Sequence, residues 1–270
     1  SSTNRNFTPA SKTEFIKDWG LDAKVGVTLG LNLDLAYNPD FAQVEVDEQQ
    51  INLTRFNIVF PEKRPFFLEN AGLFAVGRTG DVDLFFSRRI GISAEGSLVP
   101  IRGGARLSGN TGGFNVGVLN IRTGEMAGTP ANSFTAARVN RELPNRSNVG
   151  AIFVGRNGIG SLAGPDDWNR TWGLDGKVGI GEPLTFTGFA AKSETPGASG
   201  RQYAYSAGGE YKDRKHRTYL EYGVFAEHFN PEVGFLRRPE GAKRFAAGWF
   251  ETMRGEAVRA KGFRELFPHV

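Results

Sequence analysis

Residues 19–27 read Trp19-Gly20-Leu21-Asp22-Ala23-Lys24-Val25-Gly26-Val27. Leu21, Ala23, Val25 and Val27 alternate with polar or small residues, which is the two-residue period of a β-strand with one apolar face. A turn at Leu29-Gly30 leads into residues 31–37, where leucines alternate with Asn, Asp and Ala. The sequence therefore predicts a β-hairpin whose two strands share an apolar face.

A near copy of this hairpin occurs far downstream. Residues 172–180 read Trp172-Gly173-Leu174-Asp175-Gly176-Lys177-Val178-Gly179-Ile180, and Leu184, Phe186 and Gly188 follow. Duplication of a hairpin and convergence on a common strand pattern both explain the likeness. Either explanation predicts an up-and-down antiparallel meander.

Further alternating segments continue the pattern. Residues 98–108 lead into a glycine-rich turn at 109–113, whose residues suit positive φ, and residues 114–122 begin the next strand. Other predicted strands are 81–91, 133–142, 147–156, 171–180, 183–193, 202–212, 216–227 and 243–253. Most of these predicted strands are close in length to the roughly 9–11 residues that a tilted strand needs to cross a bilayer.

Composition limits the classes of protein. The chain of 270 residues has no cysteine, which excludes disulfides and thiolate metal sites. Its net charge of +4 is not concentrated in a basic run, so we expect no nucleic-acid partner. No apolar run reaches the ~20 residues of a membrane-spanning helix. A mean hydropathy of −0.34 still suits barrel strands, which alternate polar and apolar residues.

Two details favour a membrane barrel over a soluble β-sandwich, which would also alternate. The polar faces are rich in Gly, Asn, Asp, Lys and Arg, as suits a wet lumen. Aromatic residues gather near strand ends, as in interfacial girdles: Trp19, Tyr37, Trp168, Trp172, Tyr203, Tyr211 and Trp249. We predict an all-β fold, an antiparallel up-and-down transmembrane β-barrel or an incomplete portion of one. The barrel domain is residues 19–270, and residues 1–18 form an N-terminal arm or linker.

Residues 39–80 interrupt the meander and are too long for a hairpin turn. They contain Phe60-Pro61-Glu62-Lys63-Arg64-Pro65-Phe66-Phe67-Leu68-Glu69-Asn70. Each proline fixes φ and removes a backbone donor, and it also pushes the preceding residue toward an extended conformation. We expect a stiff, kinked, plug-like segment folded into the barrel, with a short helix capped by Asp47. A long surface loop is the alternative.

Charged residues of this segment form the candidate site. Glu62, Lys63, Arg64 and Glu69 lie in the kinked stretch, and Arg88 and Arg89 follow it. Buried charges need partners, so the structural interpretation is a salt-bridge network that locks the segment to the barrel wall. The functional interpretation is a selectivity ring or a binding site for a polar or anionic solute.

Catalytic patterns are weak. His216, His228 and His269 show neither metal-ligand spacing nor a nucleophile partner. Asp40, Glu45 and Asp47 do not have the spacing of an EF-hand loop. We therefore predict no catalytic residue, no metal and no cofactor.

The kinked stretch also carries a family resemblance, together with residues 38–41, 44–47, 52–56 and 84–91. These motifs resemble an uncharacterised outer-membrane β-barrel domain family of Gram-negative bacteria, whose members usually follow a family-9-type carbohydrate-binding module. The resemblance is strongest over residues 31–122 and returns at 229–235. It implies an outer-membrane location and a barrel fold, but no established activity.

Three functional hypotheses follow. The first is an outer-membrane channel or binding barrel for polar solutes, glycans among them, without catalysis. The second is a structural or assembly subunit of a larger envelope complex, with a closed lumen. The third is a soluble β-rich carbohydrate-active enzyme, which would need paired carboxylates in a cleft. The expected partners are outer-membrane lipid and, for particular hypotheses, envelope subunits or glycans.

The last residues predict continuation. Residues 263–270 begin an extended segment, but Pro268 removes a ladder donor and only two residues follow it. We expect the natural protein to be longer than these 270 residues.

Overall fold

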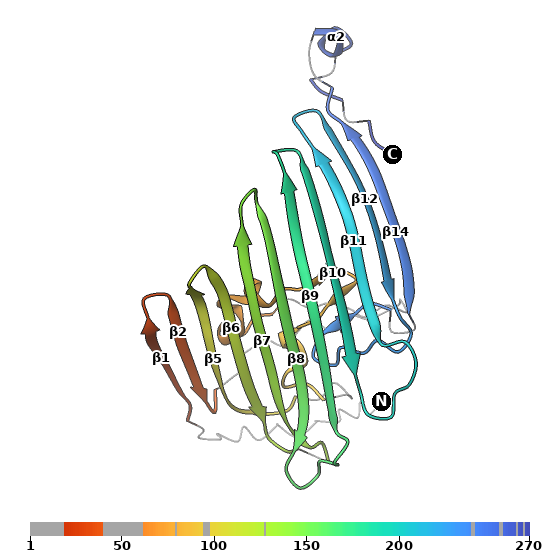
Figure 1. Cartoon of the computed structure of the whole chain (residues 1–270). Coiled ribbons are helices and arrows are strands. Elements are labelled where there is room, and N and C mark those ends of the chain that lie inside the picture. The colour runs from red at the N-terminus through yellow and green to blue at the C-terminus, as the bar shows by residue number, and fades with distance from the viewer. Residues whose placement is uncertain are drawn as a thin grey trace, which may run out of the picture.

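The structure is a computed structural model that describes residues 19–39, 62–78, 80–93, 98–126, 128–238, 241–253, 256–262, 264–266 and 268–270. Its main feature is one large antiparallel sheet of eleven strands, in which successive strands along the chain are neighbours (Figure 1). The order is β1 (Leu21–Thr28), β2 (Leu31–Tyr37), β5 (Ile101–Thr111), β6 (Phe114–Thr123), β7 (Ala131–Leu143), β8 (Ser147–Ile159), β9 (Trp168–Ile180), β10 (Leu184–Glu194), β11 (Tyr203–Lys212), β12 (His216–Phe225) and β14 (Ala242–Glu251). The predicted up-and-down meander is confirmed.

Short elements make up the rest of the described chain. A small sheet joins β3 (Gly77–Arg78), β4 (Val82–Asp83) and β13 (Phe235–Leu236). Helix is confined to the single turns α1 (Pro65–Leu68) and α2 (Glu256–Arg259) and to 3-10 turns at Ala71–Phe74 and Ser87–Arg89. Within the described ranges, no helix has the length and apolar character needed to cross a membrane.

The predicted strand at residues 81–91 is wrong. Only Val82–Asp83 is strand, and the backbone then bends into the 3-10 turn at Ser87–Arg89. Leu84 and Ile90 are fully buried, so the apolar spacing of this segment serves packing rather than a ladder. By contrast, the predicted turn after β5 is confirmed, with Gly112 at φ 57° and Gly113 at φ 80°.

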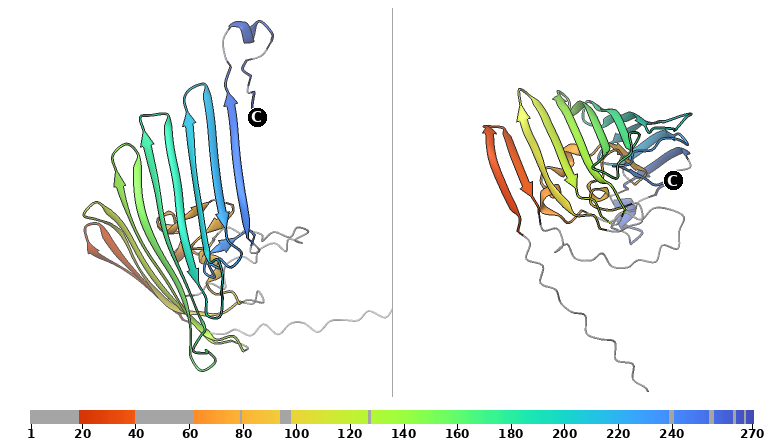
Figure 2. Two further views of the ribbon diagram at one scale, coloured as in Figure 1. Left: turned by 45° about the vertical axis from the view of Figure 1, so that its right-hand side comes forward. Right: turned by 90° about the horizontal axis from the view of Figure 1, so that it is seen from below.

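The sheet is curved but open, so the predicted closure into a barrel is not seen (Figure 2). In the described part of the chain, β1 has a partner on one side only. At the other edge of the sheet, β14 pairs with β12. The chain end folds back beside β14, where Leu266 forms an isolated antiparallel bridge with Met253 and His269 forms one with Phe250. The end of the chain thus runs antiparallel to β14 for a few residues.

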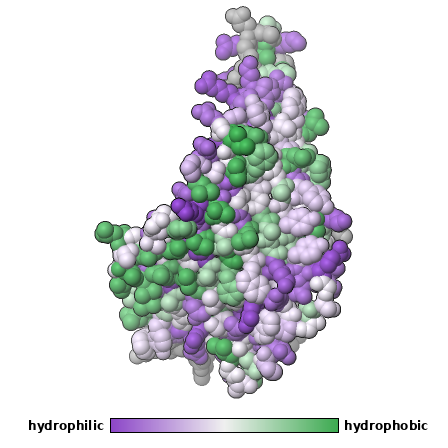
Figure 3. Space-filling model, in the orientation of Figure 1, coloured by the Kyte–Doolittle hydropathy of each residue, from purple (hydrophilic) through white to green (hydrophobic). Residues whose placement is uncertain are grey.

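Alternation gives the sheet two different faces. Asp34 on β2 and Arg106 on β5 pair in register and point to the concave face, where they meet the segment between β2 and β5. Their neighbours Leu35 and Ala105 point to the other, convex face. Large apolar side chains are exposed on this convex face along many strands: Leu21, Val25, Val118, Val139, Leu174, Val178, Phe186, Leu220, Tyr222, Phe245 and Trp249. Figure 3 shows hydrophobic residues gathered over the sheet and hydrophilic ones toward its ends.

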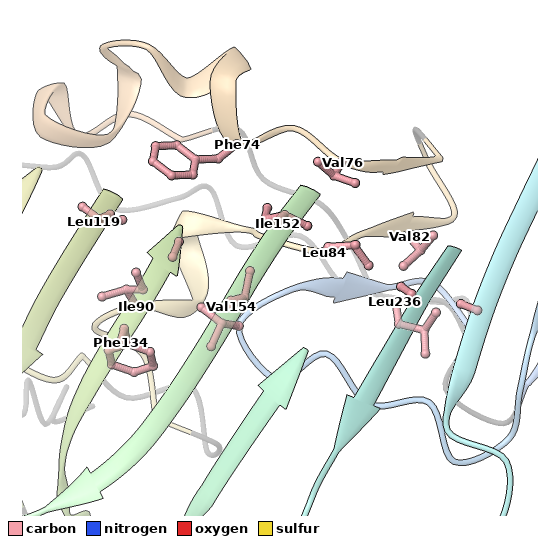
Figure 4. Packing of buried hydrophobic residues seen from close by; sticks show 14 of the residues in the cluster. Phe74, Val76, Val82, Leu84, Ile90, Leu119, Phe134, Ile152, Val154 and Leu236 are labelled. Carbon is pink, nitrogen blue, oxygen red and sulfur yellow. The ribbon is translucent and has the colours of Figure 1, made fainter. Parts of the chain in front are cut away.

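The hydrophobic core lies on the concave face. We call the described residues 62–93 the insert, and their apolar side chains pack against the sheet together with those of residues 229–236 (Figure 4). The insert contributes Phe67, Phe74, Val76, Val82, Leu84 and Ile90, and the sheet contributes Ile101, Leu119, Ile121, Phe134, Ala136, Ile152, Val154 and Phe189, among others.

Two strand glycines make this close packing feasible. A Cβ at Gly117 would lie 2.6 Å from Leu73 Cδ2 and 2.8 Å from the Phe74 ring. A Cβ at Gly173 would meet Leu84 Cδ1 and Ile152 Cγ2. Glycine in a strand interior ordinarily weakens the strand, and here it marks the approach of another segment.

Replacing Leu84 tests whether the insert is part of the folded core. We predict that Leu84→Ala lowers the free energy of unfolding by about 2–5 kcal/mol, because it leaves a cavity at a fully buried site. Leu174→Ala is the matched control, since Leu174 lies next to Gly173 and is 64% exposed on the convex face. Denaturant titration measures both free energies of unfolding. Equal losses would contradict this account of the core.

Candidate functional site

The kinked stretch closes on itself through a buried ion pair. Arg64 Nη2 lies 2.7 Å from Glu62 Oε2, and Arg64 Nε donates to Glu62 Oε1 at 2.8 Å. The same guanidinium donates to the carbonyls of Ile90 and Ser87, each at 2.7 Å. Arg64 therefore ties the beginning of the insert to its end.

Local sequence explains this geometry. Arg64 has extended backbone, as expected for a residue before proline, and Pro65 occupies the first position of α1. The guanidinium also lies 4.2 Å from the centroid of the Phe67 ring, where a cation–π contact adds to the hydrogen bonds.

The carboxyl of Glu62 is held in its ionised form. Burial by itself would raise its pKa, but hydrogen bonds from Arg64 and Ser87 and the charge of Arg64 outweigh that effect. The pKa of Glu62 is therefore lowered from its ordinary value of 4.5.

Arg106 anchors the insert to the wall of the sheet. Its side chain is 3% exposed, and Nη2 lies 2.8 Å from Asp34 Oδ2 and 3.0 Å from Glu69 Oε2. Its Nη1 donates to the main-chain carbonyls of Glu69, at 2.7 Å, and of Phe66. Lys24 on β1 pairs with Glu69 as well. This network joins β1, β2 and β5 to the end of α1.

A second set of ion pairs anchors the insert at the opposite edge of the sheet. Arg78 Nε lies 2.6 Å from Glu221 Oε1 on β12, and Arg78 Nη1 lies 2.9 Å from Asp81 Oδ2. Asp81 in turn pairs with Arg244 on β14. The insert therefore reaches across the concave face from the β1–β5 edge to the β12–β14 edge.

The structure divides the six predicted site residues into separate groups. Glu62 and Arg64 form one pair, and Glu69 belongs to the Arg106 network. Lys63 is exposed, with its main-chain N–H donated to Glu62.

The two arginines after the kinked stretch lie elsewhere on the insert. Arg88 is partly buried, which lowers its pKa. Arg89 donates from Nε to the carbonyl of Gly234 at 3.2 Å. Arg89 thereby links the insert to the segment after β12.

Sequence reasoning missed Arg106, Asp34 and Arg78 as site residues. Asp34 and Arg106 do carry a signal, since each is a charged residue on the polar side of an alternating strand. That signal indicates that both side chains lie on the polar face of the sheet, but it does not predict which residue they pair with. Glu69 lies 37 residues away from Arg106 in the chain, so local sequence patterns do not connect the two.

Two cavities lie on the concave face on opposite sides of the insert. Along β8, Asn148 lines a cavity of about 210 Å³, Ile152 belongs to the core beneath the insert, and Arg156 lines a cleft of about 730 Å³. The same order holds near β10, where Thr187 lines the smaller cavity and Thr195 lines the larger cleft. The insert therefore separates the two cavities.

In the part of the chain that the structure describes, no group of three or more His, Asp or Glu residues is placed to hold a metal ion. The weak calcium candidates Asp40, Glu45 and Asp47 lie outside the described residues, as do the Asp47 helix and the arm at residues 1–18.

These features define an all-β protein built on one antiparallel meander, whose concave face is covered by a salt-bridged insert. The chain belongs to the family described as "Domain of unknown function (DUF5916)", which matches residues 1–149. The match covers the insert and all strands from β1 to β7. Neither the comparison with curated proteins nor that with solved structures found a match.

Removing Arg106 should release the insert. We predict that Arg106→Met costs about 3–5 kcal/mol of stability, because buried Asp34 then loses its close cation and keeps only Lys24, at 3.7 Å. Adding Asp34→Leu should recover part of this loss, since the poorly compensated charge disappears. Arg102→Met, an exposed arginine of the same strand, is the control and should stay within about 0.5 kcal/mol of the parent. If the stability losses of Arg106→Met and Asp34→Leu simply add in the double variant, the two residues do not interact and the proposed ion-pair network is wrong.

Acid should weaken the Glu62–Arg64 lock. Because the folded pKa of Glu62 is depressed, its stabilisation is complete above about pH 4.5 and is lost as pH falls through the folded pKa. We expect limited proteolysis near Lys63 to accelerate below pH 4.5 in the parent protein. In Glu62→Gln, cleavage should be faster at neutral pH and change less with acid. An identical pH profile for both proteins would exclude Glu62 as the titrating group.

Proposed function

We propose that the chain is an outer-membrane β-barrel protein, or a portion of one, that binds or passes polar solutes without catalysis. The observation that carries the proposal is the apolar convex face. Leu21, Leu174 and Phe245 come from β1, β9 and β14, and each is more than 60% exposed. Single exposed apolar residues are ordinary, but a patch that follows a whole sheet marks an interaction surface.

Lipid is the occupant that fits this surface best. Strands β7, β8 and β9 have 13 residues each, which is enough for a tilted strand to cross a bilayer. Figure 1 shows the hairpin turns at the upper end of the sheet rising in steps from β1–β2 to β11–β12. A progressive stagger of this kind accompanies strand tilt in barrels. The family resemblance supports the outer membrane as the location.

Closure is part of the proposal. An unpaired strand edge in lipid leaves backbone N–H and C=O groups without partners, which costs several kcal/mol for each group. Strands beyond the described residues, or a partner subunit, must therefore pair with the free edges. Backbone hydrogen bonds of Leu266, Pro268 and Val270 to the β14 segment support antiparallel pairing at this edge.

The insert would then act as a plug-like segment in the lumen. It is anchored at both edges of the sheet, and a cavity lined by both polar and apolar residues lies on each side of it. A solute that crosses the barrel would have to pass the insert, so the insert would set selectivity.

A structural or assembly subunit with a closed lumen is the second candidate. The observation that favours it is the apolar packing of the insert, which fills the concave face much as a protein core does. Conductance tests the channel form of the first proposal: single-channel currents in a planar bilayer would support a channel and exclude a subunit with a closed lumen.

Charge on the convex face tests the membrane assignment. We predict that Leu174→Arg lowers stability in liposomes by about 2–4 kcal/mol, the cost of a cation facing lipid near the bilayer centre. Thr187→Arg is the control, because Thr187 is exposed on the concave face and should tolerate the change. The measurements are urea unfolding in liposomes and co-flotation of the protein with lipid. A protein that stays soluble without detergent, and in which both variants are neutral, contradicts the proposal and leaves the soluble enzyme hypothesis.

A further inference from the structure

The larger cleft has the chemistry of a binding site. It holds about 730 Å³, within the range of small-molecule sites. Its walls include the beginning of β7, the end of β8, the insert, residues 227–236 and the loops that hold Asp167 and Thr195, so segments far apart in the chain converge on it. None of the six charged residues singled out by the sequence lines it except Arg89.

Arg156 is held in this cleft by three side-chain hydrogen bonds. Its Nε donates to Glu232 Oε2 at 2.6 Å, and its Nη1 donates to Asp167 Oδ1 at 2.6 Å and to Asn132 Oδ1 at 2.8 Å. These three acceptors fix the plane of the guanidinium. Nη2 makes no hydrogen bond to the described residues, so it could donate to a ligand.

Arg89 offers a second set of donors. Its Nε is held by the carbonyl of Gly234, while both Nη groups make no hydrogen bond to described residues. The side chain is exposed, so it can turn toward a ligand without a large cost of burial.

Acceptors balance these donors. Asp167 and Glu232 both face Arg156, and Glu227 is paired with Arg201 at 3.1 Å. Arg201 does not line the cleft, but its ion pair neutralises Glu227. Among the lining residues, the charges of Arg89 and Arg156 then balance those of Asp167 and Glu232. A cleft with no net charge gives no general preference for anions or cations, although it presents strong donors next to strong acceptors.

We infer that this cleft binds a neutral polyhydroxylated solute, a compound of the sugar class. Adjacent hydroxyl groups can accept from a guanidinium and donate to a carboxylate at the same time, which suits the alternation of Arg156 with Asp167 and Glu232. The inference rests on the proposed function in taking polar solutes as the ligand class. It goes further by identifying the larger cleft as the cavity that binds the solute and by predicting that the solute is uncharged.

The test is calorimetric titration of the full 270-residue chain in detergent. The probes are maltose as the neutral sugar, glucose 6-phosphate as its anionic counterpart and spermidine as a cation. We expect heat of binding with maltose and at least tenfold weaker binding of the other two. Arg89→Gln should weaken maltose binding by about tenfold, the usual order for losing a charged donor. Arg217→Gln removes an exposed arginine of β12 outside the cleft and should leave binding unchanged.

Arg156→Gln is the second variant, and its fold is checked by circular dichroism before titration. If it fails to fold, the Arg89 result alone decides. Preference for glucose 6-phosphate or spermidine, absence of binding to all three probes, or equal losses in Arg89→Gln and Arg217→Gln would overturn the inference. Binding of maltose by a protein that does not enter liposomes would reject the proposed membrane function and keep this one.

Discussion

The structure depends on a single constraint: side chains of an antiparallel meander point alternately to its two faces, so the apolar side chains on both faces need an apolar environment. Across eleven strands, one set of side chains points to the convex face and the other to the concave face. The concave set includes Ile121, Ile152 and Val154, which require cover. The insert provides that cover, and Gly117 and Gly173 give it room to approach the sheet. The convex set has no cover within the described residues, which is why lipid enters the proposal.

Ion pairs fix the position of the insert on the sheet. Arg64, Arg106 and Asp81 are buried, and a buried charge without a partner is far more costly than a paired one. Each of them has partners either within the insert or across to the sheet. The pairs across to the sheet lie at its two edges, so they define the orientation of the insert as well as its attachment. Hydrophobic packing alone is non-directional and would not specify that orientation.

Strand positions follow from the sequence because the two-residue period is local. Residues 216–227 and 243–253 were predicted, and β12 and β14 lie there. The same rule fails at 81–91, where Leu84 and Ile90 are apolar because they enter the core between segments. The extended backbone of Arg64 was also predictable, since it depends only on the following proline. The partners of Arg106 and the cleft at Arg156 were not, because they join segments distant in sequence. Closure of the sheet is a long-range property of the same kind.

The most direct measurement of the central claim asks whether the convex face touches lipid. Trp172 lies in β9 on this face, beside Phe153 of β8 with ring centroids 5.8 Å apart. A variant that keeps Trp172 and replaces the other three tryptophans by phenylalanine can be reconstituted into vesicles of lipids brominated on their acyl chains. The account predicts strong quenching of Trp172 fluorescence relative to vesicles without bromine. Unquenched fluorescence from a folded protein would contradict it.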